Sequence, residues 1–277
     1  MTIEAVEKRS SAKVWASVGK YAVLGLGVFL TLGPVVWTLI TALTPTDPET
    51  NITSFGLAAF ADVFTKIPVW LYTWNSALVT LLAAAGQMLT AAMAGYVFAR
   101  FEFRAKKMLF VMILATMMVP MQVTIVPVFM LIRGMGLADT LLALILPAIP
   151  TAFGTFLMRQ YFMGLPPELA EAAQIDGAGP WRVFFGVYLP LATPGLAIVG
   201  ILAFNYHWNE FFRPLIMTIS EQNFTLPLGL VTLQGNLGTG SVSTVLAGVV
   251  ISMIPALLVF VFGQKPLREG LTAGAGK

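Results

Sequence analysis

Cysteine is absent from this chain, and histidine occurs once, at His207. The absence of cysteine excludes disulfides and thiolate metal sites. A single histidine leaves no histidine pair to hold a catalytic metal. Charged residues are also scarce, at 10% of the chain, whereas soluble domains carry about 25%. The net charge of +3 is too small to predict a nucleic-acid partner.

Apolar side chains are abundant and make up 57% of the residues. A soluble protein this apolar could not cover its surface with polar groups, so lipid is the expected solvent. Six nearly charge-free runs approach the length of about 20 residues that a membrane-crossing helix needs. The sequence therefore predicts an all-α, polytopic membrane protein with transmembrane helices at about 21–44, 75–99, 108–132, 141–159, 191–213 and 244–263.

Prolines predict interruptions in two of these spans. Pro147 and Pro150 predict a kink in the fourth span, because proline removes a backbone donor and clashes with the preceding turn. Pro120 and Pro127 predict a bend in the third span, beside several methionines that suit adaptable packing.

The distribution of Lys and Arg predicts the orientation of the spans. Only Lys66, Arg133 and Arg213 fall in predicted outer segments, and the other 13 of the 16 basic residues fall on the opposite side. Because basic residues accumulate in cytoplasmic loops, both termini are predicted to be cytoplasmic. Residues 1–20 then form a cytoplasmic segment, 21–263 the membrane domain and 264–277 a cytoplasmic tail. The first apolar run is too long for a cleaved signal peptide and indicates a signal anchor.

The predicted inner loop between the fourth and fifth spans contains the signals for two short helices. Pro166 and Pro167 can begin the first, Glu168 lies near its positive N-terminal end, and Gly177 ends it. Pro180 can begin the second. An alanine-rich helix can seat in a groove of a partner protein, but an amphipathic helix at the membrane interface remains open. The absence of lysine from the first helix argues against binding to lipid headgroups.

A motif in this loop resembles that of a known family. Glu171-Ala172-Ala173 is followed after three residues by Gly177 and after nine more by Val187-Tyr188-Leu189-Pro190. This spacing resembles the EAA loop of ABC-importer permeases, with Val187 as the one departure, in place of Ile. Trp208 to Phe212 resembles a run in the fifth span of carbohydrate-type permeases. The tail from Gly270 to Ala275 resembles the ending of the smaller permease of maltose-type transporters, so the resemblance covers nearly the whole chain.

The resemblance implies an importer-permease fold in a prokaryotic inner or plasma membrane. It implies a second permease subunit, two ATPase subunits that use ATP and Mg, an extracytoplasmic solute-binding protein and a sugar or sugar-like solute. The loop at 164–190 would be the coupling helix that docks on the ATPase. By this resemblance, the ATPase-coupling residues would be Glu168, Glu171, Ala172, Ala173, Asp176 and Gly177.

The chain itself is predicted not to be an enzyme and to bind no cofactor. A phosphate-binding loop needs Gly-x4-Gly-Lys-Ser/Thr. Gly276-Lys277 is the only partial match, but position 271 is Leu271 and no Ser or Thr follows. ATP hydrolysis is therefore predicted on a separate subunit.

Polar side chains near membrane depth are candidates for the translocation path, because such groups tend to face the bundle interior or a water-filled path. The candidates are Gln87, Gln122, Asn205, His207, Trp208, Asn209 and Glu210. Alternatively, the last three lie at the outer interface. Two other functions make demands on the sequence that can be compared with its residues. An ion-coupled secondary transporter would need ionisable residues in its spans, and an intramembrane enzyme would need a catalytic constellation. The sequence favours neither.

Overall fold

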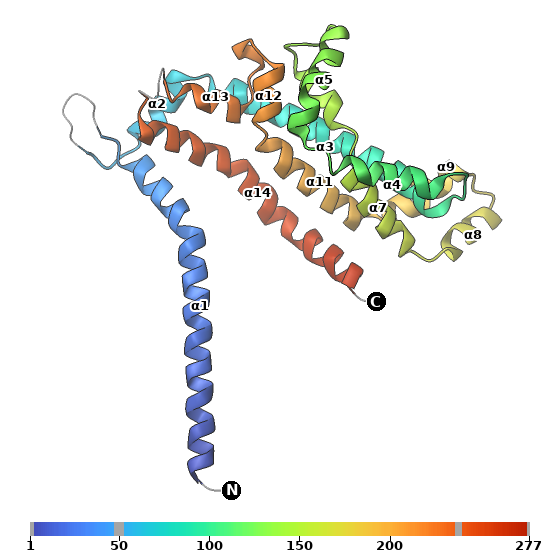
Figure 1. Cartoon of the computed structure of the whole chain (residues 1–277), viewed down its shortest axis with the longest axis horizontal. Coiled ribbons are helices and arrows are strands. Elements are labelled where there is room, and N and C mark those ends of the chain that lie inside the picture. The colour runs from blue at the N-terminus through green and yellow to red at the C-terminus, as the bar shows by residue number, and fades with distance from the viewer. Residues whose placement is uncertain (1–2, 47–52, 236–239, 276–277) are drawn as a thin grey trace. The chain divides into compact units, whose positions relative to one another are not determined.

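The computed structural model describes residues 3–46, 53–235 and 240–275, and every named element within these ranges is a helix (Figure 1). The predicted all-α class is thus confirmed. The chain divides into two compact units, one of Met1–Lys66 and Leu233–Ile251 and the other of Ile67–Thr232 and Ser252–Lys277. The second unit contains all the candidate site residues.

Three helical segments are each long and apolar enough to cross a membrane. They are Ser17–Leu43 within α1 (Ile3–Leu43), α3 (Val69–Arg100) and Val242–Gln264 within α14 (Val242–Ala275). Three bent pairs also qualify. They are α4 (Lys106–Thr116) with α5 (Met121–Gly134), Leu141–Ala148 with α7 (Ala152–Met163), and Pro180–Leu191 with α11 (Thr193–Trp208). If each bent pair is one span, the total is six, which agrees in number with the sequence, although the last pair begins at Pro180, inside the predicted inner loop.

The bends have local causes. Between α4 and α5 the chain turns by 100°, and Pro120 there adopts an extended conformation at the N-cap of α5. Pro127 instead lies inside α5, so the prediction that both prolines mark this bend is wrong for Pro127. The predicted kink in the fourth span is confirmed at 41°. It falls between η1 (Leu146–Ala148) and α7, where the Thr151 hydroxyl caps the new helix by accepting from the N–H of Gly154.

Helix boundaries differ from the charge-free runs at several places. α3 begins at Val69, before the predicted start at residue 75, because Pro68 can occupy the N-cap position and the aromatic stretch that follows is helical. The predicted outer loop at 45–74 contains α2 (Ala58–Lys66). The predicted fifth span at 191–213 is interrupted, since α11 ends at Trp208 and α12 (Phe212–Met217) follows a break.

The core of the second unit forms around α3, which packs against α7 and α11. Small residues on α3 allow close approach, and Ala91 and Ala92 are fully buried. A Cβ atom added at Gly95 would lie 2.6 Å from the Cβ of Met158 and 2.8 Å from the backbone nitrogen of Arg159. The backbones of α3 and α7 are therefore in direct contact at this level.

Asp139 connects two predicted outer loops of the second unit. Its Oδ1 accepts hydrogen bonds from the backbone N–H of Ile219 at 2.8 Å and of Ser220 at 3.0 Å, and its Oδ2 accepts from the Ser220 hydroxyl. These donors lower the pKa of Asp139 from 3.8 to about 2. They fix the turn between α12 and η3 (Glu221–Asn223) to the segment that precedes α6 (Leu141–Ile145).

Candidate functional site

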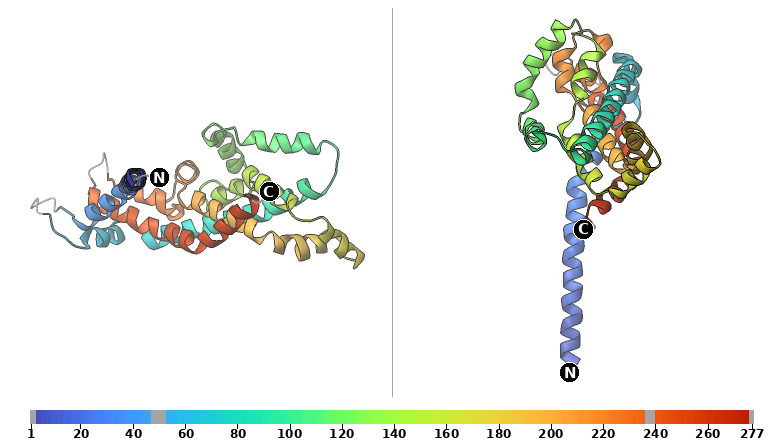
Figure 2. Two further views of the ribbon diagram at one scale, coloured as in Figure 1. Left: turned by 90° about the horizontal axis from the view of Figure 1, so that it is seen from below. Right: turned by 90° about the vertical axis from the view of Figure 1, so that its right-hand side faces the viewer.

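The loop at 164–190 forms four short helical segments at one end of the second unit (Figures 1 and 2). They are α8 (Glu168–Ile175), α9 (Pro180–Val183), the π-helical turn η2 (Phe184–Tyr188) and α10 (Leu189–Leu191). Gly177 lies between the first two and has a φ of 79°, which L side chains rarely adopt. The predicted pair of short helices that meet at Gly177 is confirmed.

The helix α8 has one covered face and one open face. Ala173 is half-buried and packs with Ala170 against an aromatic cluster. The other sequence-predicted coupling residues are exposed, namely Glu168, Glu171, Ala172, Asp176 and Gly177. Within the ranges that the structure describes, none of these carboxylates forms an ion pair. Ile175 is 86% exposed, so the open face combines free carboxylates with an apolar side chain.

The aromatic cluster beneath α8 joins the loop to the membrane helices. Tyr188 of η2 is buried and lies between Tyr96 of α3 and Phe162 of α7, with ring centroids 5.2 and 6.1 Å away. Phe184 packs on the same Tyr96 ring at 4.9 Å. Such aromatic pairs contribute about 0.5–1.5 kcal/mol each beyond the area that they bury. The loop therefore rests on a tightly packed base.

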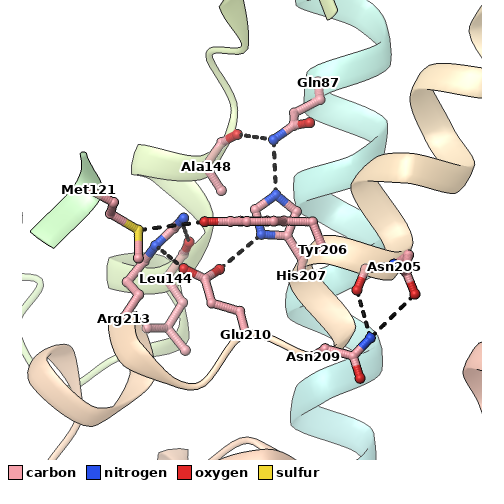
Figure 3. A network of polar contacts seen from close by, with 10 residues as sticks. All are labelled: Gln87, Met121, Leu144, Ala148, Asn205, Tyr206, His207, Asn209, Glu210 and Arg213. Atoms are coloured by element: carbon pink, nitrogen blue, oxygen red, sulfur yellow. Dashed lines mark hydrogen bonds and ion pairs between the residues drawn. The ribbon is translucent and has the colours of Figure 1, made fainter. Parts of the chain in front are cut away.

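A second group of site candidates forms a buried polar network (Figure 3). The side-chain nitrogen of Gln87 donates to the backbone oxygen of Ala148 at 2.7 Å and lies 2.9 Å from Nε2 of His207. Because the amide NH2 group is the donor in both contacts, Nε2 of His207 is the acceptor. The imidazole proton then sits on Nδ1, which lies 3.0 Å from Oε2 of Glu210. Gln87, His207 and Glu210 are thus brought together.

Arg213 completes this network and was not among the sequence-predicted site residues. Its Nε lies 3.0 Å from Oε1 of Glu210, and both side chains are 8% exposed. Its guanidinium also donates to the backbone oxygen of Leu144 at 2.9 Å. The two charges compensate each other, which lets both side chains stay out of water. The spacing of three residues between Glu210 and Arg213 was the available sequence signal.

The remaining path candidates lie elsewhere. Trp208 is buried and donates from Nε1 to the backbone oxygen of Ser252 in α14 at 2.9 Å. Asn209 is exposed and donates to the backbone oxygen of Asn205 at 2.8 Å, one turn earlier. Gln122 is exposed on α5. Figure 3 also draws Asn205 and Asn209, whose dashed lines join them only to each other. Among the described residues, no side-chain hydrogen bond or ion pair links Trp208, Asn209, Asn205 or Gln122 to His207 or Glu210.

Comparison with known proteins places this arrangement in a family. The family described as "Binding-protein-dependent transport system inner membrane component" matches residues 87–265. The chain belongs to this family. As a permease of binding-protein-dependent transport, it is a multi-pass component of the inner membrane and serves import.

Individual relatives align over most of this permease. It is 36% identical to the arabinooligosaccharides transport system permease protein AraQ of Halalkalibacterium halodurans, over 83% of this chain and 81% of the relative. It is 33% identical to the lactose transport system permease protein LacG of Rhizobium radiobacter, over 91% of this chain and 93% of the relative.

The fold of this permease also matches solved importers. It superposes with a TM-score of 0.79 on a chain from the crystal structure of a bacterial ABC transporter involved in the import of the acidic polysaccharide alginate. The match covers 92% of this chain and 97% of that one, at 23% identity. The importer-permease fold predicted from the sequence is therefore confirmed.

Proposed function

We propose that this chain is one of two permease subunits in an ATP-driven importer of a sugar or sugar-like solute. A second permease, two ATPase subunits that bind ATP and Mg, and an extracytoplasmic solute-binding protein complete the assembly. The names of the relatives support the solute class, since they transport arabinooligosaccharides, lactose and diacetylchitobiose. The chain forms half of the translocation path.

The open face of α8 is the observation that carries the coupling role. Glu168 and Glu171 present carboxylates to solvent, while Ile175 adds an exposed apolar side chain. A groove on the ATPase with basic and apolar groups is complementary to this face. Ala170 and Ala173 on the covered face let α8 pack closely against the aromatic cluster. A force on the exposed face is therefore transmitted through this cluster to the membrane helices.

The coupling has a simple physical form. When the ATPase dimer closes, it displaces α8, and the loop moves with the spans that flank it, α7 and α11. The translocation path then opens alternately to the two sides of the membrane. Net import follows if the solute site has a different affinity in the two states.

Within the path, the exposed side chains and the buried network have different roles. Three amides are exposed and can face the solute, namely Asn205 on α11, Asn209 at the C-cap of α11 and Gln122 on α5. The amides of such residues suit the hydroxyl groups of sugars, because each offers a donor and an acceptor. His207 and Glu210 are occupied by their partners in the network, so they brace the outer end of α11.

The coupling role is tested by copurification of the ATPase with tagged permease variants. Glu171→Ala removes a carboxylate from the open face and should reduce the amount of ATPase recovered. Glu102→Ala is the matched control, because its carboxylate is 89% exposed on the same predicted side of the membrane, and it pairs with Lys106 outside the loop. It should recover the ATPase as the unaltered chain does.

Two results would contradict the proposal. One is recovery of the ATPase by Glu171→Ala at the level of the unaltered chain, together with normal ATP-driven transport. The other is equal loss of the ATPase in both variants, because that would trace the effect to general surface charge.

A further inference from the structure

Arg100 is the last residue of α3, and its side chain reaches the start of the loop at 164–190. One guanidinium nitrogen donates to the backbone oxygen of Phe162 at 2.6 Å and to that of Leu165. Phe162 lies in the last turn of α7 and Leu165 lies two residues after its end, and the Phe162 oxygen also accepts from the backbone N–H of Leu165 at 3.2 Å. A cation at this position also meets the negative end of the helix dipole.

The same side chain reaches the end of the loop. Its guanidinium carbon lies 4.8 Å from the centre of the Tyr188 ring, which is 1% exposed. Tyr188 lies two residues before Pro190, just ahead of α11. Arg100 therefore contacts the residues through which the loop leaves the fourth span and those through which it enters the fifth.

We propose that Arg100 is a positioning residue that fastens both ends of the coupling loop to α3, so that α3 and α8 move as one rigid body. This inference rests on the proposed coupling function and assigns a transmission role within it. Without the fastening, a displacement of α8 would be absorbed in the loop and would not reach the second span.

The chemistry of arginine suits this position. One guanidinium nitrogen binds two carbonyl oxygens while the guanidinium carbon lies over an aromatic face, and the planar, weakly hydrated guanidinium suits such stacking better than a compact, strongly hydrated ammonium. Arg100→Lys keeps the positive charge, and with it the topology signal, but its ammonium has no planar face to place over the Tyr188 ring and is more strongly hydrated. It is therefore the sharpest single substitution.

Arg159 provides a matched control. It lies on α7, donates from Nε to the backbone oxygen of Phe98 in α3 at 3.1 Å, and has its guanidinium carbon 4.4 Å from the Phe110 ring centre. It thus joins the same two helices at the same end, but its recorded partners both lie outside the loop. Arg159→Lys should weaken helix packing without freeing the loop.

Tyr188 provides a second pair of variants. Its hydroxyl has no hydrogen-bond partner among the described residues, whereas its ring touches Arg100. Tyr188→Phe keeps the ring and should behave like the unaltered chain. Tyr188→Leu removes the ring and should behave like Arg100→Lys.

The test is a spin-label distance measured in the assembled importer, purified with its ATPase. This chain contains no cysteine, so within it labels attach only at Gln174→Cys on α8 and Leu89→Cys on α3, both at exposed positions, and the partner subunits are used in cysteine-free form. Double electron–electron resonance is recorded without nucleotide and with ATP plus vanadate. In the otherwise unaltered chain we expect one narrow distance distribution that is the same in both conditions.

With Arg100→Lys or Tyr188→Leu, we expect a broadened distribution that shifts when nucleotide is added, while ATPase copurification is retained. Arg159→Lys and Tyr188→Phe should keep the narrow distribution. An unchanged narrow distribution with Arg100→Lys would overturn the inference, as would a nucleotide-dependent shift in the otherwise unaltered chain. Failure of the proposed function would appear separately, as normal ATPase recovery by Glu171→Ala.

Discussion

At the scale of single residues, backbone conformation explains the end of α8 at Gly177, and nearby hydrogen-bond donors explain the lowered pKa of Asp139. Gly177 stops α8 in a conformation with a φ of 79°, and no atom lies within 4 Å of the position where a Cβ would stand. Within this chain, any effect of a side chain there must therefore come from the backbone. Gly179 also has open space around it, but its φ is −71°.

This contrast gives a matched pair of substitutions. Gly177→Ala should destabilise the end of α8 by about 1–2 kcal/mol, which is the typical penalty for a left-handed conformation in an L-residue. It should also lower the recovery of the ATPase. Gly179→Ala should leave both unchanged. Copurification yield and the thermal midpoint in detergent measure the two effects, and equal behaviour of the two variants would contradict the backbone argument.

Asp139 makes a pH-dependent contribution to stability. Its pKa is about 2 in the folded protein, below the ordinary 3.8. A lowered pKa means that the carboxylate stabilises the fold above pH 3.8 and that this contribution is lost as pH falls toward 2. Asp139→Asn keeps a residue type that tolerates the φ of 57° but removes the charge.

We expect Asp139→Asn to be less stable than the unaltered chain at pH 7, by about 1 kcal/mol for weakened charge-assisted hydrogen bonds. The difference in thermal midpoint should shrink below pH 4. A difference that stays constant from pH 7 to pH 3 would show that the charge is not responsible.

Some of these residues could be recognised from the sequence and others could not. The spacing of Glu171 and Gly177 predicts the loop, because both act through local helix chemistry. Arg100 and Arg213 entered the sequence analysis only as charges on one or the other side of the membrane. Apart from the ion pair of Arg213 with Glu210, three residues earlier, their contacts lie far along the chain, at Tyr188 and Leu144, and no local pattern encodes such contacts.

At the scale of elements, the network in Figure 3 joins several segments of the second unit, including α6, whose Leu144 oxygen accepts from Arg213. Gln87 belongs to α3, His207 to α11, Arg213 to α12, and Ala148 to η1 at the kink of the fourth span. The kink leaves backbone oxygens without helical donors. One of them, the oxygen of Ala148, accepts a hydrogen bond from the side chain of Gln87. The network thus stabilises broken helices at membrane depth.

Removing one charge of this network should cost more than removing both. Glu210→Gln or Arg213→Met leaves one buried charge without its partner, which typically destabilises by about 3–5 kcal/mol. In the double variant neither charge remains, so the loss should be smaller than the sum of the single losses. Denaturant unfolding in detergent gives the three values, and strict additivity would contradict the coupling.

The element scale also shows where sequence patterns work. The six apolar runs and the kink at Pro147 and Pro150 follow from hydropathy and proline chemistry. The sequence did not predict the helix α2 or the early start of α3 at Val69. Aromatic residues such as Trp70 and Trp74 fit both an interface loop and a helix. Tertiary contacts decide between these states.

At the scale of the whole molecule, the orientation in the membrane remains a prediction from the basic residues. Ile175 on α8 and Ile219 beside Asp139 are 86% and 81% exposed, and they fall on opposite predicted sides. Since the chain has no cysteine, Ile175→Cys and Ile219→Cys each introduce a single thiol. A membrane-impermeant maleimide should label Ile219→Cys in intact cells and Ile175→Cys only after the membrane is opened. The reverse pattern would invert the topology.

The central claim is that the ATPase covers the open face of α8. The most direct measurement is the rate at which a maleimide labels Ile175→Cys in purified permease, with and without the bound ATPase, using Ile219→Cys as the control. We predict that the ATPase slows labelling at Ile175→Cys and leaves the rate at Ile219→Cys unchanged. Equal labelling of Ile175→Cys in both preparations would contradict the account.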